Sequence, residues 1–166
     1  MTYLIIYMSH HGTTRRIANE MADRLGRNNV MVVNLSDMVM PDLELFDTIL
    51  IGGSMHVGRV QKKIRKFCLK HRDILLQKRL GLFLCFMDKE YGQEEFHDAF
   101  PEDLRDHAIA HGLFCGELII DKMNLFERLV LRKAKGVVEN VSAIDRAAVT
   151  AFVEAVNEPA TNRHRA

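Results

Sequence analysis

Short apolar runs alternate with longer stretches of helical period along this chain, and few folds accommodate that alternation. It is typical of βαβ units, in which parallel strands are covered by helices on both faces. We therefore predict an α/β fold, a three-layer sandwich around a five-stranded parallel sheet in the order 2-1-3-4-5. The predicted strands cover residues 3–8, 30–35, 46–52, 80–87 and 113–120.

Helical periodicity places the connections between these strands. Ile17, Met21 and Leu25 recur at four-residue spacing and predict an amphipathic helix over 14–27. A second helix follows the third strand, a third lies within 101–111, and a last one ends near 157 after a cap at Ser142 or Asp145. The apolar stripe of the second helix consists of Val60, Ile64, Phe67, Cys68, His71 and Leu75.

Length and composition predict one domain over 1–157, followed by a flexible tail at 158–166. The longest apolar run, 82–87, falls far short of the ~20 residues that cross a bilayer. No basic leader precedes the first strand, so we expect a cytoplasmic protein. The three cysteines form no C-x-x-C pair, which favours reduced thiols packed in the core.

Charge is distributed unevenly although the net charge is only +1. Residues 59–72 contain seven Lys or Arg and no acid, whereas 88–106 contain eight Asp or Glu against Lys89 and Arg105. This predicts two oppositely charged surfaces. The basic surface indicates an anionic partner, either a small molecule or an acidic protein, with a solvated helix face as the alternative. Nucleic acid is not expected, because no aromatic residues interleave the basic ones.

Ligands of such sheets bind beyond the carboxyl ends of the first and third strands. The first strand is followed by Ser9-His10-His11-Gly12-Thr13-Thr14, where hydroxyls and a glycine lead into a helix start. This pattern suits a phosphate, although an ordinary turn capped by Thr13 or Thr14 has the same composition. Neither a Walker A motif nor G-x-G-x-x-G occurs, which argues against ATP and dinucleotides.

The third strand leads into a loop bracketed by Gly52, Gly53 and Gly58. Glycines of this kind let the backbone approach a flat ligand, against which Met55, His56 and Val57 can lie. His56 is a candidate proton donor or shuttle, with a solvent-exposed residue as the alternative.

The two loops, Ser9-x-x-Gly12-x-Thr14 and Gly52-Gly53-Ser54-x-x-x-Gly58, resemble the FMN-binding loops of flavodoxin-like proteins. The stretch I-G-G-S-M-H-V-G-R-V-Q-K-K-I-R-K-F-C-L-K-H over 51–71 is similar to the menaquinone-dependent protoporphyrinogen IX dehydrogenase branch, as is Cys115-Gly116-Glu117-Leu118. The resemblance covers most of the chain, from Tyr3 to about Gly136, and the acidic segment 88–106 departs from it. It implies FMN as cofactor and a flavodoxin-like oxidoreductase. Protoporphyrinogen dehydrogenase and a flavodoxin-type electron carrier are the alternatives.

The resemblance also implies which residues hold the cofactor. Ser9, His10, His11, Gly12, Thr13 and Thr14 would bind the phosphate, and Ser54, Met55, His56, Val57 and Gly58 would bind the ring. A third loop over 88–92 would add Asp88 and Tyr91. Tyr91 is expected either to stack on the flavin or to be a surface aromatic.

Two further patterns have ordinary alternatives. His107 and His111 have a zinc-compatible spacing on one predicted helix, but no H-E-x-x-H accompanies them, and we predict no metal. Residues 124–135 form a basic amphipathic stretch that packs on its own domain or contacts the inner face of a membrane. Two other classes of this architecture are excluded. Gly52 stands where a response-regulator receiver has an Asp, and no cysteine begins a C-x5-R loop.

Overall fold

A computed structural model of the chain describes residues 1–9, 12–37, 39–54, 59–86, 92–115 and 145–158. Its centre is a parallel sheet in the order β2-β1-β3-β4-β5, which confirms the predicted architecture. The strands are β1 Tyr3–Met8, β2 Val30–Asn34, β3 Thr48–Ser54, β4 Arg79–Phe86 and β5 Ala110–Cys115.

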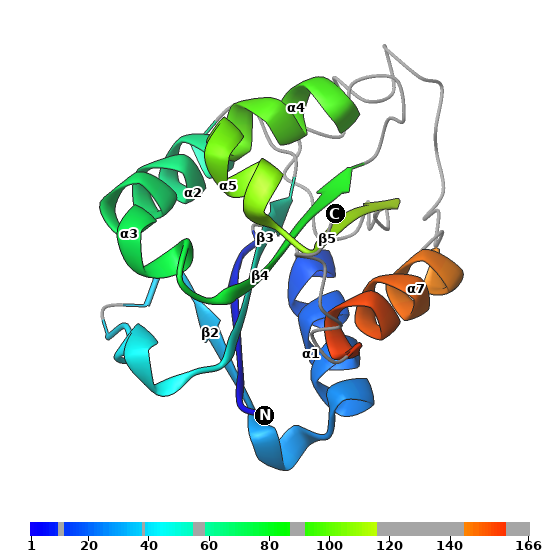
Figure 1. Cartoon of the computed structure of the whole chain (residues 1–166). Helices are drawn as coiled ribbons and strands as arrows, with labels where there is room; N and C mark the ends of the chain where they lie inside the picture. Colours follow the sequence, from blue (N-terminus) through cyan, green and yellow to red (C-terminus); the bar gives the residue numbers. More distant parts are fainter. Residues whose placement is uncertain (10–11, 38, 55–58, 87–91, 116–144, 159–166) are drawn as a thin grey trace, which may run out of the picture.

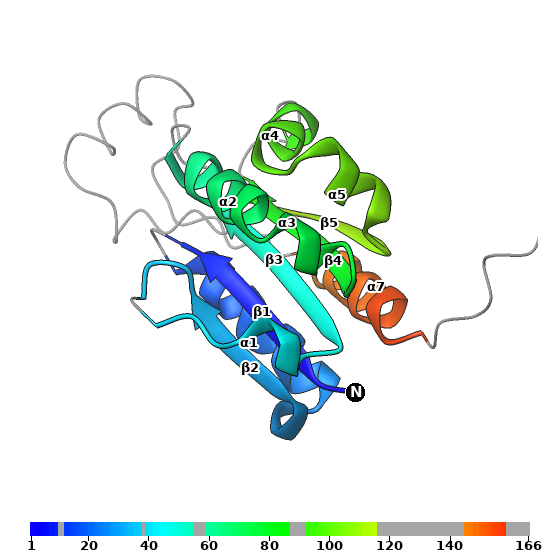
Figure 2. The same ribbon diagram turned by 60° about the vertical axis from the view of Figure 1, so that its left-hand side comes forward.

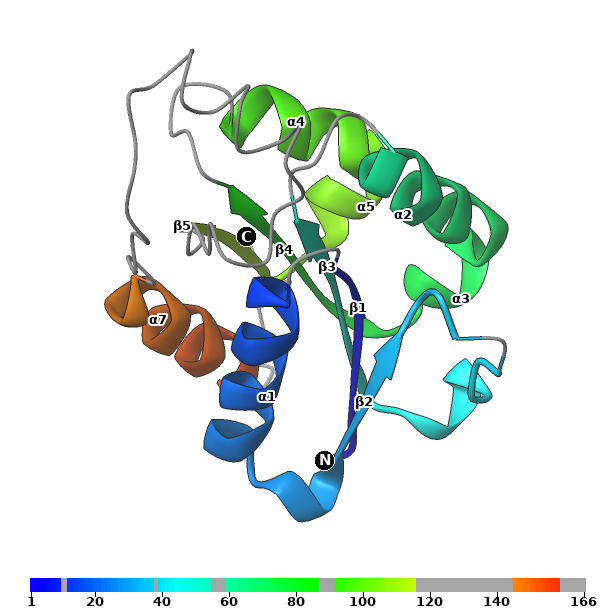
Figure 3. The same ribbon diagram turned by 180° about the vertical axis from the view of Figure 1, so that it is seen from behind.

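Helices cover both faces of the sheet (Figure 1). On one face lie α1 Thr13–Leu25 and α7 Arg146–Asn157, which Figure 3 shows from behind. The other face carries α2 Arg59–Lys70, α3 Arg72–Leu75, α4 Gly92–Ala99 and α5 Glu102–His107 (Figure 2). Two short 3-10 turns, η1 Arg27–Asn29 and η2 Leu43–Leu45, precede β2 and β3.

Each face of the sheet buries its own apolar cluster, because successive strand residues point to opposite faces. Ile49, Ile51 and Leu82 pack under α2, α4 and α5 with Ile64 and Phe100. The cluster under α1 and α7 contains Ile5, Tyr7, Ile17, Met21, Leu50, Phe83, Cys85, Phe114, Phe152 and Val156. Burial on both faces explains why the strands appear in the sequence as continuous apolar runs.

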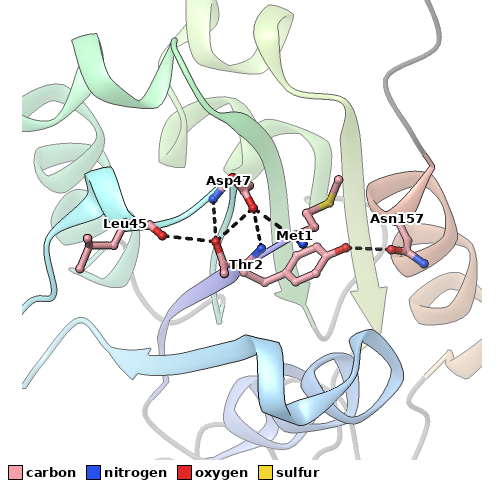
Figure 4. Close-up of polar contacts among 6 residues, drawn as sticks. Met1, Thr2, Leu45, Asp47 and Asn157 are labelled. Carbon is pink, nitrogen blue, oxygen red and sulfur yellow. Dashed lines mark hydrogen bonds and ion pairs between the residues drawn. The ribbon is translucent and has the colours of Figure 1, made fainter.

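The amino ends of β1 and β3 are joined by a polar cluster (Figure 4). The Thr2 backbone N–H donates to the Asp47 carboxylate at 2.7 Å, and the Asp47 N–H donates back to Thr2 Oγ1 at 3.2 Å. The Tyr3 hydroxyl donates to Asn157 Oδ1 at 2.8 Å, which ties the end of α7 to the same edge. These hydrogen bonds connect β1, β3 and α7 at the amino-terminal edge of the sheet. The carboxyl ends of the strands lie at the opposite edge.

Several predicted boundaries differ from those in the structure. The stripe over 60–75 predicted one helix, but α2 ends at Lys70 and α3 begins at Arg72, with His71 between them. Asp145, not Ser142, caps α7, because its side chain accepts from the Ala148 N–H at 3.0 Å. β5 begins at Ala110 instead of Leu113, since Ala110 to Gly112 pair with Gly81 to Phe83 of β4. The helix α4 was not predicted at all.

His107 and His111 were predicted to share one helix, but the structure places them on different elements. His107 is the last residue of α5, whereas His111 lies on β5, so the i, i+4 spacing has no structural meaning. The His107 ring nitrogen Nε2 contacts the Lys78 carbonyl at 2.9 Å, and His111 Nε2 contacts the Arg105 carbonyl at 2.8 Å. Both rings are used for local structure. Within the described ranges, no three His, Cys, Asp or Glu side chains gather as metal ligands would.

Candidate functional site

The candidate site lies at the carboxyl edge of the sheet, where β1 connects to α1. The register pairs Met8 with Gly53 and Ser54 with Cys85, so β1, β3 and β4 end at the same level. The start of α1 lies at this edge as well (Figure 3). β2 lies on the far side of β1 from β3, which makes this the switch point predicted to bind ligands.

Gly12 forms the entry to α1 in a left-handed conformation. Its φ is 89°, a region in which a side chain is strained, so the glycine is required by the turn itself. The Gly12 N–H donates to Ser9 Oγ at 3.0 Å, and its carbonyl accepts from the Arg16 N–H at 3.0 Å. The Ser9 side chain therefore closes the turn. The N-cap residue of α1 is Gly12, so neither Thr13 nor Thr14 caps this helix as the sequence had allowed.

Thr14 is the most informative residue of this turn. Its side chain is fully buried, yet Oγ1 makes no hydrogen bond in the part of the chain that the structure describes. Leaving a buried hydroxyl unpaired costs about 1–3 kcal/mol, so such groups need an explanation. At the first turn of a thirteen-residue helix, a bound anion supplies one, because the helix dipole and backbone N–H groups also favour it.

Ser54 and Cys85 continue this polar group across the sheet. Ser54 Oγ is buried without a hydrogen-bond partner among the described residues, and Cys85 is its register neighbour on β4. Burial raises the pKa of the Cys85 thiol to about 12, and the Thr14 hydroxyl beside it lowers that pKa in part. Cys85 is therefore a neutral thiol next to Thr14 at neutral pH. The sequence predicted a reduced thiol packed in the core, and the free, buried Cys85 confirms this.

Gly52 has a different role from the one predicted. It lies inside β3, and a Cβ there would come within 2.3 Å of the Phe83 ring. The absence of a side chain serves core packing, not the approach of a ligand. The residues predicted to bind the ring, Ser54 to Gly58, begin two positions later, so this packing role of Gly52 does not bear on them.

The structure brings five of the predicted site residues to this edge: Ser9, Gly12, Thr13, Thr14 and Ser54. Thr13 and Thr14 are both buried under the turn. The remaining predicted residues lie outside the described ranges: His10, His11, Met55, His56, Val57, Gly58, Asp88 and Tyr91. The residues at the edge fit a phosphate group, since they offer hydroxyls and a helix start and form a turn that only glycine adopts without strain.

Six of the seven basic residues over 59–72 divide into two sets. Arg65 and Arg72 face the acidic helices. Arg65 Nη1 donates to the Asp98 carbonyl at 3.4 Å, and Arg72 is ion-paired with Asp103. Lys62, Lys63, Lys66 and Lys70 are exposed and form no ion pair with any described residue. We call these four residues the lysine face of α2. The predicted surfaces of opposite charge are therefore adjacent, and they partly neutralise each other.

None of the described helices is long and apolar enough to cross a membrane.

Comparison with known proteins identifies the class. The model of the Flavodoxin domain family matches residues 4–142, so the chain belongs to this family. Membership confirms the family predicted from the two loops and supports FMN as the cofactor.

Solved structures agree on the fold. Oxidised Flavodoxin 1 from Bacillus cereus superposes with a TM-score of 0.52 at 15% identity, covering 94% of this chain and 97% of that one. The flavodiiron protein from Giardia intestinalis has a TM-score of 0.50 at 14% identity, covering 93% of this chain and 36% of that one. A comparison with curated proteins gives no match.

Proposed function

We propose that this chain is an FMN-dependent oxidoreductase whose β1–α1 connection holds the phosphate of the cofactor. The observation that carries the proposal is the fully buried Thr14 hydroxyl at the start of α1, for which the described residues provide no hydrogen-bond partner. It lies directly after a glycine turn, at the switch point of a flavodoxin-family sheet. When bound, FMN supplies the electron-transfer chemistry, while the chain supplies binding, orientation and electrostatics.

The phosphate site is tested by titrating apoprotein with FMN and with riboflavin, which lacks the phosphate. We expect FMN to bind more tightly, and Thr14→Ala to lower FMN affinity by about tenfold or more, as loss of a hydrogen bond to a charged group does. Riboflavin affinity should stay unchanged. Equal affinity of the wild type for both flavins would remove the phosphate site from the proposal.

Thr48 provides a matched control for this titration. Its hydroxyl is also fully buried and unpartnered among the described residues, but it lies at the amino end of β3. Thr48→Ala should leave both flavin affinities unchanged. If it weakened FMN binding as much as Thr14→Ala, the effect would come from general loss of packing and not from the site.

Protoporphyrinogen IX dehydrogenase is a second candidate, supported by the similarity of residues 51–71 to that branch. The lysine face supports it as well, because porphyrin propionates are anionic. Porphyrin fluorescence that grows when the holoprotein is mixed with protoporphyrinogen and a quinone would establish this activity. If the flavin exchanged electrons only with other redox proteins, the chain would instead be an electron carrier.

The remaining elements of the proposal rest on sequence. His56 is proposed as the proton donor or shuttle beside the flavin, and Met55, Val57 and Gly58 as its ring contacts. The basic amphipathic sequence over 124–135 is proposed as a peripheral contact with the inner face of a membrane, in a cytoplasmic protein. All of these residues lie outside the described ranges. An anionic small molecule or acidic redox protein is proposed as partner, supported by the exposed lysine face of α2.

A further inference from the structure

The first turn of α1 carries positive charge that no acidic side chain of the turn offsets. Arg15 and Arg16 are both exposed, and the turn contains no Asp or Glu. The N-terminus of a helix already bears a partial positive charge from its dipole, so acidic residues are the favoured ones there. The two arginines therefore work against the stability of this helix, and their position needs another explanation.

Arg15 is the arginine whose side chain has no partner. Its guanidinium forms no hydrogen bond or ion pair with any described residue, and Asn19 Nδ2 bonds to the Arg15 carbonyl instead. Arg24 lies nine residues further along, about two and a half turns, so the two side chains leave opposite sides of α1. Since Arg24 Nη1 donates to Thr150 of α7 at 2.8 Å, Arg15 faces away from α7.

The residue before Arg15 lacks a partner as well. Thr14 is fully buried, and its Oγ1 has no hydrogen-bond partner among the described residues. Side chains of an α-helix lean toward its N-terminus, so a long side chain at position 15 covers the surface over the helix start. A single anion bound at this start would satisfy a buried hydroxyl and an exposed guanidinium together.

We propose that Arg15 is a phosphate-binding residue of the cofactor site: its guanidinium pairs with the FMN phosphate from the solvent side of the turn. This inference rests on the proposed function of the β1–α1 connection. The planar guanidinium suits a phosphate, because it can donate two parallel hydrogen bonds to two of the oxygens. Arg15 thus opposes the helix dipole in the empty protein and is compensated when the phosphate is bound.

Arg15→Gln is the test, because Gln has about the same helix propensity as Arg but no charge. FMN affinity should fall by about three- to tenfold, and riboflavin affinity should stay within about twofold. In the apoprotein the same change should raise the Tm by about 1–4 °C, because it removes a positive charge from the positive end of the dipole. Inorganic phosphate should raise the apoprotein Tm more in the wild type than in Arg15→Gln.

Arg16 supplies the matched control. It carries the same charge one residue further along, about 100° around the helix from Arg15. Arg16→Gln should therefore keep the preference for FMN over riboflavin within about twofold of the wild type. An equal loss of this preference in both variants would show that any positive charge near the helix start suffices, and it would overturn the contact assigned to Arg15.

The outcomes separate this inference from the one beneath it. A wild type that does not prefer FMN over riboflavin overturns the phosphate site itself. A wild type that prefers FMN, with the preference kept in Arg15→Gln, overturns only the role of Arg15. A lower apoprotein Tm in Arg15→Gln, with parallel loss of affinity for both flavins, would show that the side chain supports the helix and would also overturn it.

Discussion

At the scale of single residues, Gly12 is the clearest link between backbone conformation and the site. Its φ of 89° is left-handed, and its N–H is fixed by Ser9, so the turn into α1 depends on the missing side chain. Gly12→Ala should destabilise the fold by about 1–2 kcal/mol and also lower FMN affinity, because relief of the strain moves the amide groups at the helix start. Denaturant unfolding and flavin titration measure the two effects separately.

Gly26 makes this a controlled comparison, since it ends the same helix at a φ of 88°. Its surroundings are open, with only Asn29 Nδ2 at 3.9 Å from the place of a Cβ. Gly26→Ala should therefore cost stability of a similar size without touching FMN affinity. Equal loss of affinity in both variants would mean that the cofactor senses only the stability of α1, and the turn at Gly12 would have no special role.

At the scale of elements, the tie between the amino ends of β1 and β3 predicts a dependence on pH. Hydrogen bonds from Thr2, then the nearby N-terminal charge, lower the pKa of Asp47 below its usual value. A group whose pKa is lower in the folded state adds stability above its unfolded pKa of about 4 and loses it as the pH falls. The gap in Tm between wild type and Asp47→Ala should be present at pH 7 and close as the pH falls through the lowered pKa.

Asp37 serves as the control carboxylate for this comparison. It is exposed after β2, and its side chain makes no hydrogen bond to a described residue. The Tm gap of Asp47→Ala should change more over this pH range than that of Asp37→Ala, because the hydrogen bonds from Thr2 are made to Asp47. Equal changes in the two gaps would show that the Thr2 contacts do not depend on the ionised carboxylate.

The same scale shows how far sequence patterns reach. β1 was predicted at its observed bounds because its six consecutive apolar residues are buried on both faces of the sheet. Such a run marks a buried strand whatever residues flank it. β5 was misplaced because Ala110, His111 and Gly112 have low strand propensity, and pairing with β4 decides their conformation. Gly112 is needed there, since a Cβ would come within 2.4 Å of the Phe114 ring, a contact between two residues that periodicity does not report.

The helices show a similar division. α1 was predicted from its regular apolar spacing, but α4 is eight residues long and buries few side chains, among them Phe96 and Ala99, so its acidic residues looked like a loop. Of the site, sequence located the turn before α1 through its hydroxyls and glycine. It also predicted Cys85 as a reduced thiol packed in the core, which its free and buried state confirms.

At the scale of the whole molecule, charge is arranged so that one basic face stays free. Arg65 and Arg72 are bound to α4 and α5, whereas the lysine face of α2 has no ion-pair partner among the described residues. α2 starts after the loop that leaves β3, so its first turn lies toward the site edge of the sheet. An anionic partner that approaches this edge is attracted before contact, which raises its rate of association.

This arrangement predicts that turnover with the true partner falls as ionic strength rises, because exposed charges are screened beyond about 8 Å at physiological salt. Lys62→Gln, Lys63→Gln and Lys66→Gln together should lower kcat/KM at low salt, flatten its salt dependence, and leave FMN bound. The triple change Glu94→Gln, Glu102→Gln and Asp106→Asn on the neighbouring acidic helices is the control, and it should leave kcat/KM unchanged or raise it. Porphyrins, quinones and acidic redox proteins are the substrates to compare. If turnover with all of them ignored both salt and the lysine substitutions, the lysine face would be a solvated surface, and the anionic-partner proposal would be wrong.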